Sequence, residues 1–527
     1  MTDVRILTEA LGGSPFSRFI QRGASPAAWL SAPPLSADAW RQWASSRAAA
    51  ANWSDRLAAL APAFAATGAA ADRLERVQRE GGVVVTTGQQ PGLFGGPVYT
   101  WSKAIGALAF ADALERDTGI ATAAVFWAAT DDADFAEASY TVLGLPGGAE
   151  VLRSTYAPPA GTPMSVTPLG DLSAELTRLE QAAGSAADPR PLRIVREAYG
   201  DASCTVGEAY VALLREVLAP LGIPVLDASH AAVRTASEPT LRAALEGARD
   251  IEAALAGRSR EIRAAGFEPQ VEDVAGLSLV FIREGTVKRR LGIAEVPEVA
   301  SDAVLTPNVL LRAIVERDIL PTVAYIGGPG ELAYFAQVSA VASAMGAPAP
   351  MALPRWSCTL IEPHVGQLLA RFGIEPTALS QPDALEGVVA RMAMSPASTD
   401  AFANVRRSIA GLPGALAPES DPLGLGAAVQ GAMQSLQHRV DRLERRLVAR
   451  IKRRETQLLR DVATLRAALY PRGTRQERAL NLLPTLSRHG LGVLDDMRVA
   501  AAGHAADLIQ PASPVSAESE TSPLSAR

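Results

Sequence analysis

Short uncharged runs next to glycines alternate with longer helical patterns over the first two thirds of the chain. Residues 83–87 are a run of valine and threonine that follows two glycines, and residues 121–129 form a second run without charge. β-Branched runs of this length are typical of strands buried on both faces. The residues between them, from Pro97 onward, predict a helix, because proline suits the first helical turn. The order strand, helix, strand predicts a βαβ unit with a right-handed crossover.

The same alternation returns further along the chain, with interruptions. Residues 206–221 and 223–227 predict another helix and strand, and residues 321–326 predict a strand that leads through a glycine loop into a helix. Residues 145–200 are rich in glycine, proline and serine, and residues 236–305 carry charged helical patterns and one β-like run. We therefore expect an α/β fold with a doubly wound parallel sheet and two inserted segments.

A different pattern begins near residue 424. Apolar residues recur at steps of three and four between arginine-rich flanks, at Val429, Met433, Leu436, Val440, Leu443, Leu447, Ile451, Leu458, Val462, Leu465 and Leu469. This seam predicts a coiled-coil helix of about 45 residues, with a stutter near Ile451 and a length of about 70 Å. The segment 479–491 is too short to cover the whole stripe. We therefore expect a homodimer that forms through the coiled coil.

The chain is expected to fold as a discontinuous core followed by a helical domain. Residues 1–144 hold N-terminal helices and the first part of the core, which continues through residues 201–235 and 306–375, between insertions at 145–200 and 236–305. The helical and coiled-coil domain spans residues 376–501. Residues 502–527 are rich in serine, proline and alanine and are expected to form a disordered tail.

The composition narrows the class of protein. The 527 residues are 48% hydrophobic and 20% charged, which suffices for a large core. A net charge of −6 argues against a nucleic-acid partner, because such proteins normally carry a basic surplus. Two cysteines, Cys204 and Cys358, lack metal-ligand spacing, and the chain has no apolar leader and no apolar run of about 20 residues. These features predict a soluble, cytoplasmic protein with no membrane association.

The loop after the first predicted strand is a candidate binding site. It contains Gly88, Gln89, Gln90, Gly95 and Gly96, and it leads into a helix whose second turn carries Lys103. A glycine-rich loop between a parallel strand and a helix N-terminus is a common position for anions and nucleotides. Lysine occurs only at Lys103, Lys288 and Lys452, which draws attention to this one. The alternatives are a tight βα connection without a ligand and a lysine on a solvated helix face.

The second predicted strand ends in an acidic loop that contains Asp131, Asp132, Asp134 and Glu137. Clustered carboxylates at this position can hold a substrate amine or Mg²⁺, or act as a general base. Aspartate is also a common turn residue and helix N-cap, so a purely structural loop is the alternative.

A second strand-to-helix glycine loop contains Gly327, Gly328, Gly330 and Glu331. Two further polar residues lie near the predicted strand ends, Asn308 and Arg355, and the latter suits bidentate pairing with a carboxylate or phosphate. No histidine lies in either glycine loop, so the sequence gives little support to a histidine-based mechanism.

Several of these segments together resemble the bacillithiol biosynthesis cysteine-adding enzyme family. They are TTGQQPGLFGGPVYTWSKAI, VFWAATDDADF, LTPNVLLRAIVERDILPTVAYIGGPGELAYFAQ, LPRWSCTLIEP and LYPRGTRQERALN, spread in order over residues 80–490. The resemblance implies a Rossmann-type core related to nucleotidylyltransferases, connecting insertions, and a C-terminal coiled coil that dimerises. It also implies a cysteine ligase that joins L-cysteine to the amine of glucosaminyl-malate in the last step to bacillithiol.

This chain departs from the family pattern in the acidic loop. The family usually has Glu-Asp-His-Asp there, whereas this chain has Asp131-Asp132-Ala133-Asp134, and Ser139-Tyr140 replaces a downstream Asn-His. The departure leaves open a ligase for another amine, or a catalytically degenerate ligand-binding protein whose coiled coil is the working part.

Amide formation needs an activated carboxyl group, and the implied core suggests activation as an acyl-adenylate. We therefore treat ATP or ADP and Mg²⁺ as candidate cofactors. The glycine loops and Lys103 are expected to cradle the nucleotide or acyl phosphate. The aspartates of the acidic loop are expected to hold an ammonium group or Mg²⁺, and Arg355 and Asn308 are expected to position a carboxylate.

Overall fold

The computed structural model describes residues 2–49, 53–380, 394–454 and 456–511. The chain divides into two compact units. The first consists of Met1–Val142, Val151–Thr359 and Leu480–Arg527, and the second of Leu143–Glu150 and Leu360–Ala479. The first unit is therefore built from segments that flank most of the second along the sequence.

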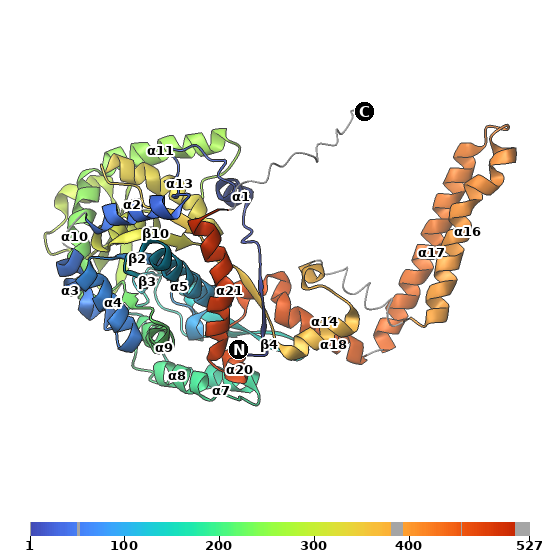
Figure 1. Cartoon of the computed structure of the whole chain (residues 1–527), viewed down its shortest axis with the longest axis horizontal. Helices are drawn as coiled ribbons and strands as arrows, with labels where there is room; N and C mark the ends of the chain where they lie inside the picture. Colours follow the sequence, from blue (N-terminus) through green and yellow to red (C-terminus); the bar gives the residue numbers. More distant parts are fainter. Residues whose placement is uncertain (1, 50–52, 381–393, 455, 512–527) are drawn as a thin grey trace. The chain divides into compact units, whose positions relative to one another are not determined.

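A five-stranded parallel sheet lies at the centre of the first unit (Figure 1). Its order is β11–β10–β2–β3–β6, with bounds β2 Val83–Gln89, β3 Thr122–Ala128, β6 Val225–Asp227, β10 Thr322–Gly327 and β11 Ala352–Pro354. The chain builds from β2 through β3 to β6, and then returns to place β10 and β11 on the other side of β2. This is the Rossmann-type strand order, so the predicted doubly wound sheet is confirmed.

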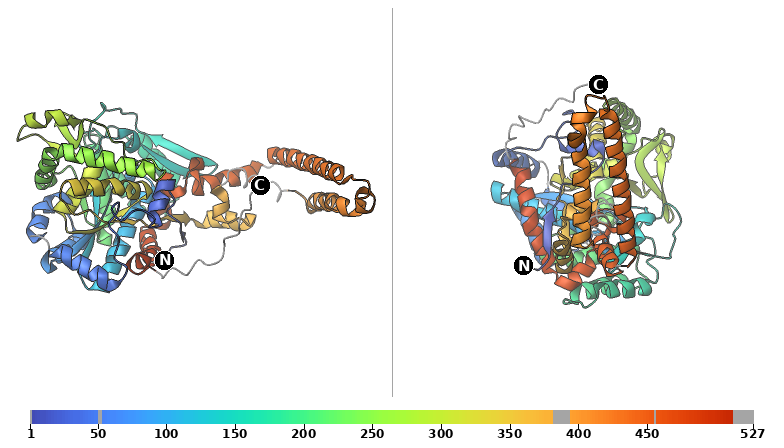
Figure 2. Two further views of the ribbon diagram at one scale, coloured as in Figure 1. Left: turned by 90° about the horizontal axis from the view of Figure 1, so that it is seen from above. Right: turned by 90° about the vertical axis from the view of Figure 1, so that its right-hand side faces the viewer.

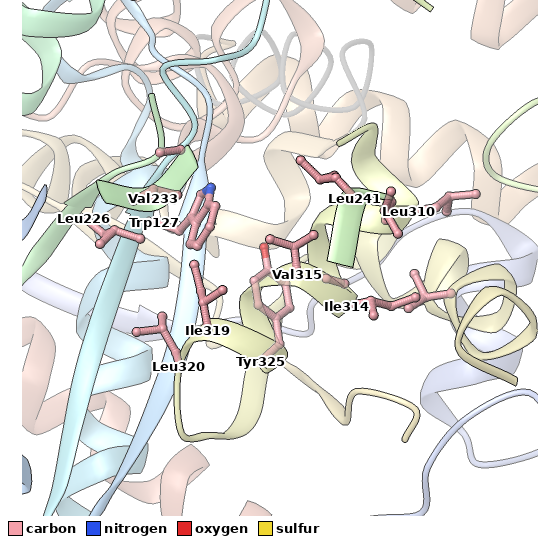
Figure 3. Close-up of a cluster of buried hydrophobic side chains, with 14 of the residues drawn as sticks. Trp127, Leu226, Val233, Leu241, Leu310, Ile314, Val315, Ile319, Leu320 and Tyr325 are labelled. Atoms are coloured by element: carbon pink, nitrogen blue, oxygen red, sulfur yellow. The ribbon is translucent and has the colours of Figure 1, made fainter. Parts of the chain in front are cut away.

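The sheet is buried on both faces, which explains the uncharged runs in its sequence. Every residue of β3 is buried, and β3 pairs with β2 along its whole length, from Val83↔Thr122 to Gln89↔Ala128. On one face lies the crossover helix α5 (Val98–Thr118), nearly all of which is buried. On the other face, strand residues such as Trp127 and Tyr325 point toward Val315 and Ile319 of helix α12 (Val309–Ile319; Figure 3).

The remaining elements of the first unit surround this sheet. Before β2 come β1 (Arg5–Thr8), α1 (Pro15–Gln21), α2 (Ala37–Ala48), α3 (Trp53–Phe64) and α4 (Gly68–Glu80). Between β3 and β6 come α6 (Phe135–Ala138), α7 (Ser173–Ala183), α8 (Arg190–Tyr199) and α9 (Val206–Leu218), and also β4 (Tyr140–Leu145) and β5 (Gly148–Arg153), whose connecting part Leu143–Glu150 belongs to the second unit. Between β6 and β10 come α10 (Ala231–Glu246), α11 (Ala248–Ala264), α12 and the three-stranded sheet of β7 (Leu277–Glu284), β8 (Val287–Gly292) and β9 (Leu305–Pro307). Helix α13 (Pro329–Ala344) follows β10, and β12 (Cys358–Ile361) follows β11.

The C-terminal segment of the first unit corrects one prediction. After α20 (Leu483–His489), helix α21 spans Gly492–Ile509 and so continues past residue 502, where the sequence predicted a disordered tail. Helix α21 packs along α5 and buries Ala501, Ala505 and Ile509. Alanines that suggested a tail by composition thus form a close helix contact. Residues 512–527 of the predicted tail lie outside the described residues.

The second unit is helical, with α14 (Pro363–Phe372), α16 (Pro396–Ser420), α17 (Gly426–Arg454), α18 (Thr456–Leu469) and α19 (Gln476–Ala479). Helices α16 and α17 lie side by side as an antiparallel hairpin (Figures 1 and 2), in which Arg406 pairs with Asp441 at 2.8 Å and with Glu444. Ile409 is buried within the hairpin. The predicted helix of about 45 residues corresponds to α17 and α18, which end and begin on either side of residue 455, a position outside the described residues. Helix α17 also has a partner in its own chain, α16, that the sequence did not predict.

Candidate active site at the carboxyl edge of the sheet

The topology of the sheet identifies where a ligand would bind. The chain leaves β2 toward β3 on one side and later places β10 on the other side of β2, so the strand order reverses between β2 and β10. Rossmann-type proteins bind ligands outside the carboxyl ends of the strands at this switch point, because the loops there diverge. The two predicted glycine loops, after β2 and after β10, flank this point.

The side chain of Lys103, in the second turn of α5, extends to the carboxyl end of β2. Only 3% of Lys103 is exposed, and its Nζ donates to the Gly88 carbonyl at 2.9 Å and to Gln89 Oε1 at 3.0 Å. It also forms an ion pair with Glu331 Oε2 at 2.5 Å. Burial lowers the pKa of Lys103, and the attraction to Glu331 opposes that effect. The alternative of a solvated helix face is excluded.

Glu331, in the first turn of α13, is held by three donors. Besides Lys103, it accepts hydrogen bonds from the Tyr325 hydroxyl and, at 2.6 Å, from the Gly328 backbone N–H. Burial acts to raise the pKa of Glu331, but Lys103 and the two hydrogen bonds outweigh burial and hold this pKa below its usual value. Glu331 is therefore a fixed carboxylate that orients Lys103.

Arg355 lies next to this pair. A Cβ on Gly328 would come within 3.6 Å of Arg355 Nε and 3.9 Å of Lys103 Cε, so both cations approach the backbone of the second glycine loop. Only 2% of Arg355 is exposed, and its Nη1 donates to the Trp356 carbonyl at 2.9 Å. Lys103 and Arg355 are thus brought together next to Gly88 and Gly328 of the two predicted glycine loops, and we call them the cationic zone.

A buried polar cluster supports this zone from behind, and the sequence did not reveal it. Arg312 of α12 pairs with Glu316 at 2.7 Å and donates to the Tyr334 hydroxyl at 3.2 Å, while Thr86 of β2 donates to Glu316. The guanidinium carbon of Arg312 lies 5.0 Å from the centre of the Tyr325 ring. An Arg–Glu pair four residues apart is typical of exposed helix surfaces, so no local signal marks this pair as buried.

The acidic loop after β3 is held largely by its own backbone. Asp132 Oδ1 accepts the N–H of Asp134 at 2.9 Å, and Asp134 Oδ1 accepts the N–H of Glu137 at 3.2 Å, which caps α6. Burial raises the pKa of Asp131, and the charge of Lys288 opposes this effect. Among the described residues, no group of three or more histidine, cysteine, aspartate or glutamate side chains is placed to hold a metal ion.

Two side chains connect the acidic loop to the first glycine loop. Glu137 accepts a hydrogen bond from Gln90 Nε2 at 2.5 Å and another from the Tyr99 hydroxyl at 3.1 Å. The Tyr99 hydroxyl in turn accepts from Gln89 Nε2 at 3.2 Å. A chain of hydrogen bonds therefore runs from buried Lys103 through Gln89 and Tyr99 to Glu137.

Lys288 is a further residue of the site that the sequence did not place there. It lies on β8, and its Nζ donates to the backbone carbonyl of Asp131 and lies 4.9 Å from the centre of the Phe281 ring. The insertion that carries β8 thus reaches the acidic loop. The signal available in the sequence was the scarcity of lysine, since two of the three lysines lie at this edge.

Other predicted residues have a clear structural role, and their part in binding stays a prediction. Asn308 caps α12 by accepting the Leu311 N–H at 3.0 Å. Gly95 and Gly96 are buried with φ of +85° and +73°, and a Cβ on Gly95 would come 2.6 Å from Trp101 Cζ2. A Cβ on Gly330 would face Gln270 at 3.7 Å, away from Lys103. The amide of Asn481 donates to the Phe94 carbonyl at 2.9 Å and fixes the first glycine loop.

At the switch point two cations, Lys103 and Arg355, lie with one carboxylate, Glu331, and beyond β3 the four carboxylates of the acidic loop lie with one cation, Lys288. The edge therefore has a zone with excess positive charge and a zone with excess negative charge. Cations next to glycine loops suit a phosphate or carboxylate, and carboxylates suit an amine. An enzyme that joins an acid to an amine needs both kinds of group in one site.

Two protein-family models match the chain. The model described as "Bacillithiol biosynthesis BshC, N-terminal Rossmann-like domain" matches residues 34–295 and 293–356, and the model described as "Bacillithiol biosynthesis BshC, C-terminal coiled-coil domain" matches residues 358–506. The chain belongs to the BshC family. This confirms the resemblance found in the sequence, the Rossmann-like domain and the C-terminal coiled-coil domain. The relation to nucleotidylyltransferases stays a prediction.

Relatives in the BshC family match over most of their length. "Putative cysteine ligase BshC" of Solibacter usitatus is 32% identical over 463 residues, which cover 83% of this chain and 86% of the relative. The protein of the same name in Koribacter versatilis is 33% identical over 456 residues, covering 82% and 84%. That of Symbiobacterium thermophilum is 30% identical over 455 residues, covering 77% and 80%. The described helices include none that is long and apolar enough to cross a membrane.

Proposed function

We propose that this protein is a ligase that joins the carboxyl group of L-cysteine to the amine of glucosaminyl-malate, the last step of bacillithiol biosynthesis. The name of its relatives supports a cysteine substrate. The observation in this chain that supports ligation is the pair of oppositely charged zones at one sheet edge, with Lys103 and Arg355 in one and Asp131 and Glu137 in the other.

In this proposal the cysteine carboxyl group is activated by ATP as an acyl-adenylate. Lys103 and Arg355 bind the phosphate of the activated group next to the two glycine loops. Because the Gly88 carbonyl, Gln89 and Glu331 take the three N–H donors of Lys103, the ammonium group acts on the developing negative charge through its own fixed positive charge. In this proposal Mg²⁺ enters with the nucleotide phosphates, which are ligands that it commonly takes in ATP sites.

Mass spectrometry of a purified reaction tests the proposal. The wild-type protein with L-cysteine, glucosaminyl-malate, ATP and Mg²⁺ should form bacillithiol and consume ATP. A reaction with L-serine in place of cysteine is the matched substrate control. Formation of an amide from a different amine, but not from glucosaminyl-malate, would assign the protein to another amine substrate. Loss of bacillithiol in a deletion strain would link the protein to the pathway, and an unchanged thiol pool would argue against it.

We further propose that two copies of the chain associate through α17. Helix α16 leaves part of the predicted seam uncovered, because Leu436, Leu443 and Leu447 of α17 remain exposed to 41%, 60% and 36%. Three leucines at steps of seven and four lie along one side of a helix, which is typical of a coiled-coil contact. A second copy that covers them would remove this apolar surface from water.

A further inference from the structure

We propose that Glu137 is the general base that accepts the proton of the attacking amine, and that Tyr99 is its positioning residue. This inference rests on the proposed ligase function and adds a role that neither the glycine loops nor the aspartates fill. Glu137 is partly exposed, whereas Lys103 and Arg355 are almost fully buried, so a substrate amine can reach the Glu137 carboxylate from solvent.

The other carboxylates at the edge of the sheet are already committed. Glu331 is paired with Lys103, and Glu316 is paired with Arg312 and 1% exposed. Asp227, at the end of β6, accepts hydrogen bonds from Thr130 and from the Ser229 N–H at 3.0 Å. These three carboxylates hold other parts of the protein in place.

The aspartates of the acidic loop are less suitable for the same reason. Asp132 and Asp134 accept backbone N–H groups of their own loop, and Asp131 is less exposed to solvent than Glu137. His230, also at this edge, uses Nδ1 to cap α10 by accepting the Ala232 N–H at 3.1 Å, and it follows β6, two strands away from β2.

Glu137 differs in the kind of partner that it has. The two side chains that donate hydrogen bonds to its carboxylate, the Gln90 amide and the Tyr99 hydroxyl, are both neutral. The charged and titratable groups that face it are Asp132 and Asp134 from its own loop, Lys103 and Tyr99 from α5, and Tyr210 from α9. Partial burial, together with the nearby Asp134 and Asp132 charges, raises the pKa of Glu137, while the Tyr99 hydrogen bond and Lys103 lower it. The net effect raises the pKa of Glu137 above its usual value, so its carboxylate is more basic than usual.

The position of Glu137 suits the transfer as well. The chain of hydrogen bonds through Tyr99 and Gln89 places it on the acidic side of the same glycine loop whose Gly88 carbonyl holds Lys103. An acyl phosphate bound at Lys103 and an amine bound at Glu137 would therefore meet across the end of β2.

The proton balance of the step is simple. The neutral amine nitrogen attacks the carbonyl carbon of the acyl-adenylate, and a C–N bond forms. The bond from that carbon to the phosphate oxygen breaks, and AMP leaves with the electron pair. Nitrogen gives one proton to the Glu137 carboxylate, which later releases it to solvent.

The experiment measures kcat/KM against pH for the full-length protein with glucosaminyl-malate as the amine. At low pH, kcat/KM of the wild type should fall as two groups become protonated, Glu137 and the substrate amine, and we call this fall the acid limb. Glu137→Gln should lower kcat/KM by about 10² to 10⁴ and remove the part of the acid limb that is due to Glu137. The limb due to the substrate amine stays in all variants. Tyr99→Phe should keep the limb but move it to higher pH, because it removes a hydrogen bond that lowers the pKa of Glu137. Glu246→Gln, at an exposed position at the end of α10, is the matched control and should match the wild type.

The outcomes separate this inference from the proposed function. If the wild-type protein is active and the Glu137→Gln variant keeps both the rate and the acid limb, Glu137 is not the general base, and the proposed ligase function is unaffected. A Tyr99→Phe variant whose acid limb stays in place would overturn the positioning role. A wild-type protein that forms no amide would overturn the ligase function and the base together.

Discussion

Replacing Lys103 with methionine tests whether the ion pair at the switch point holds the site together. Methionine is similar in length to lysine but carries no charge, so Lys103→Met leaves the Glu331 carboxylate without its cation. At the observed separation of 2.5 Å, two unit charges attract by about 7 kcal/mol at an effective dielectric constant of about 20. The desolvation of Lys103, which is 3% exposed, offsets part of this attraction.

We expect Lys103→Met to lower the free energy of unfolding of the first unit by about 3 to 5 kcal/mol, as for other buried pairs that lose one partner. The hydrogen bonds from Tyr325 and Gly328 to Glu331 remain and keep the loss within that range. The double variant Lys103→Met with Glu331→Gln removes both charges. It should therefore be more stable than the sum of the two single changes predicts.

Tryptophan fluorescence during urea unfolding measures this change in the first unit alone. The chain has seven tryptophans, at positions 29, 40, 43, 53, 101, 127 and 356, and all lie in that unit. Arg79→Met breaks an exposed ion pair with Glu80 and should cost less than about 1 kcal/mol. A Lys103→Met protein as stable as the Arg79→Met control, or additivity of the two single changes, would refute a stabilising Lys103–Glu331 pair.

Three further predictions follow from other contacts. The pKa of Glu331 is lower in the folded protein than in the unfolded chain, so its contribution to stability is complete above the unfolded carboxyl pKa and is lost as pH falls through the folded pKa. Below about pH 4.5, the free energy of unfolding should therefore decrease less in Glu331→Gln than in the wild type. Gly95→Ala should destabilise the first unit more than Gly119→Ala, since both have positive φ but only Gly95 has Trp101 in the way, and equal unfolding midpoints would contradict this. Leu443→Glu with Leu447→Glu should convert a dimer into a monomer in sedimentation, whereas Gln434→Glu on the opposite side of α17 should not; a wild-type monomer at micromolar concentration would argue against the contact.

The sequence predicted those parts of the fold that local patterns determine. The strands β2, β3 and β10 follow from short apolar runs next to glycines, and α5 follows from its position after a proline. Helix α16 lies within the predicted helical domain, but its pairing with α17 was not predicted, because its stretch of alanine, serine and two internal prolines has no strong seam of its own. Its pairing with α17 depends on a turn that folds the chain back on itself.

The candidate site was predicted in part for the same reason. Lys103, Glu331 and Arg355 each lie just after a predicted strand or in the first two turns of a predicted helix, so their common edge could be inferred from parallel topology. The contact of Lys288 with the acidic loop joins residues that are 157 positions apart. No periodicity in the sequence reports a contact of that kind, because it depends on where an inserted sheet lies in space.

The last segment of the first unit has a consequence for how the protein forms during synthesis. Asn481, which fixes the first glycine loop, and α21, which covers α5, leave the ribosome only after the whole second unit has been made. Until then, the glycine loop lacks its clamp and one side of α5 lacks its cover. The nascent chain can pair its parallel strands early, but the site matures only when translation is nearly complete. A chain truncated before Leu480 would therefore expose an apolar helix surface and be a candidate for chaperone capture or proteolysis.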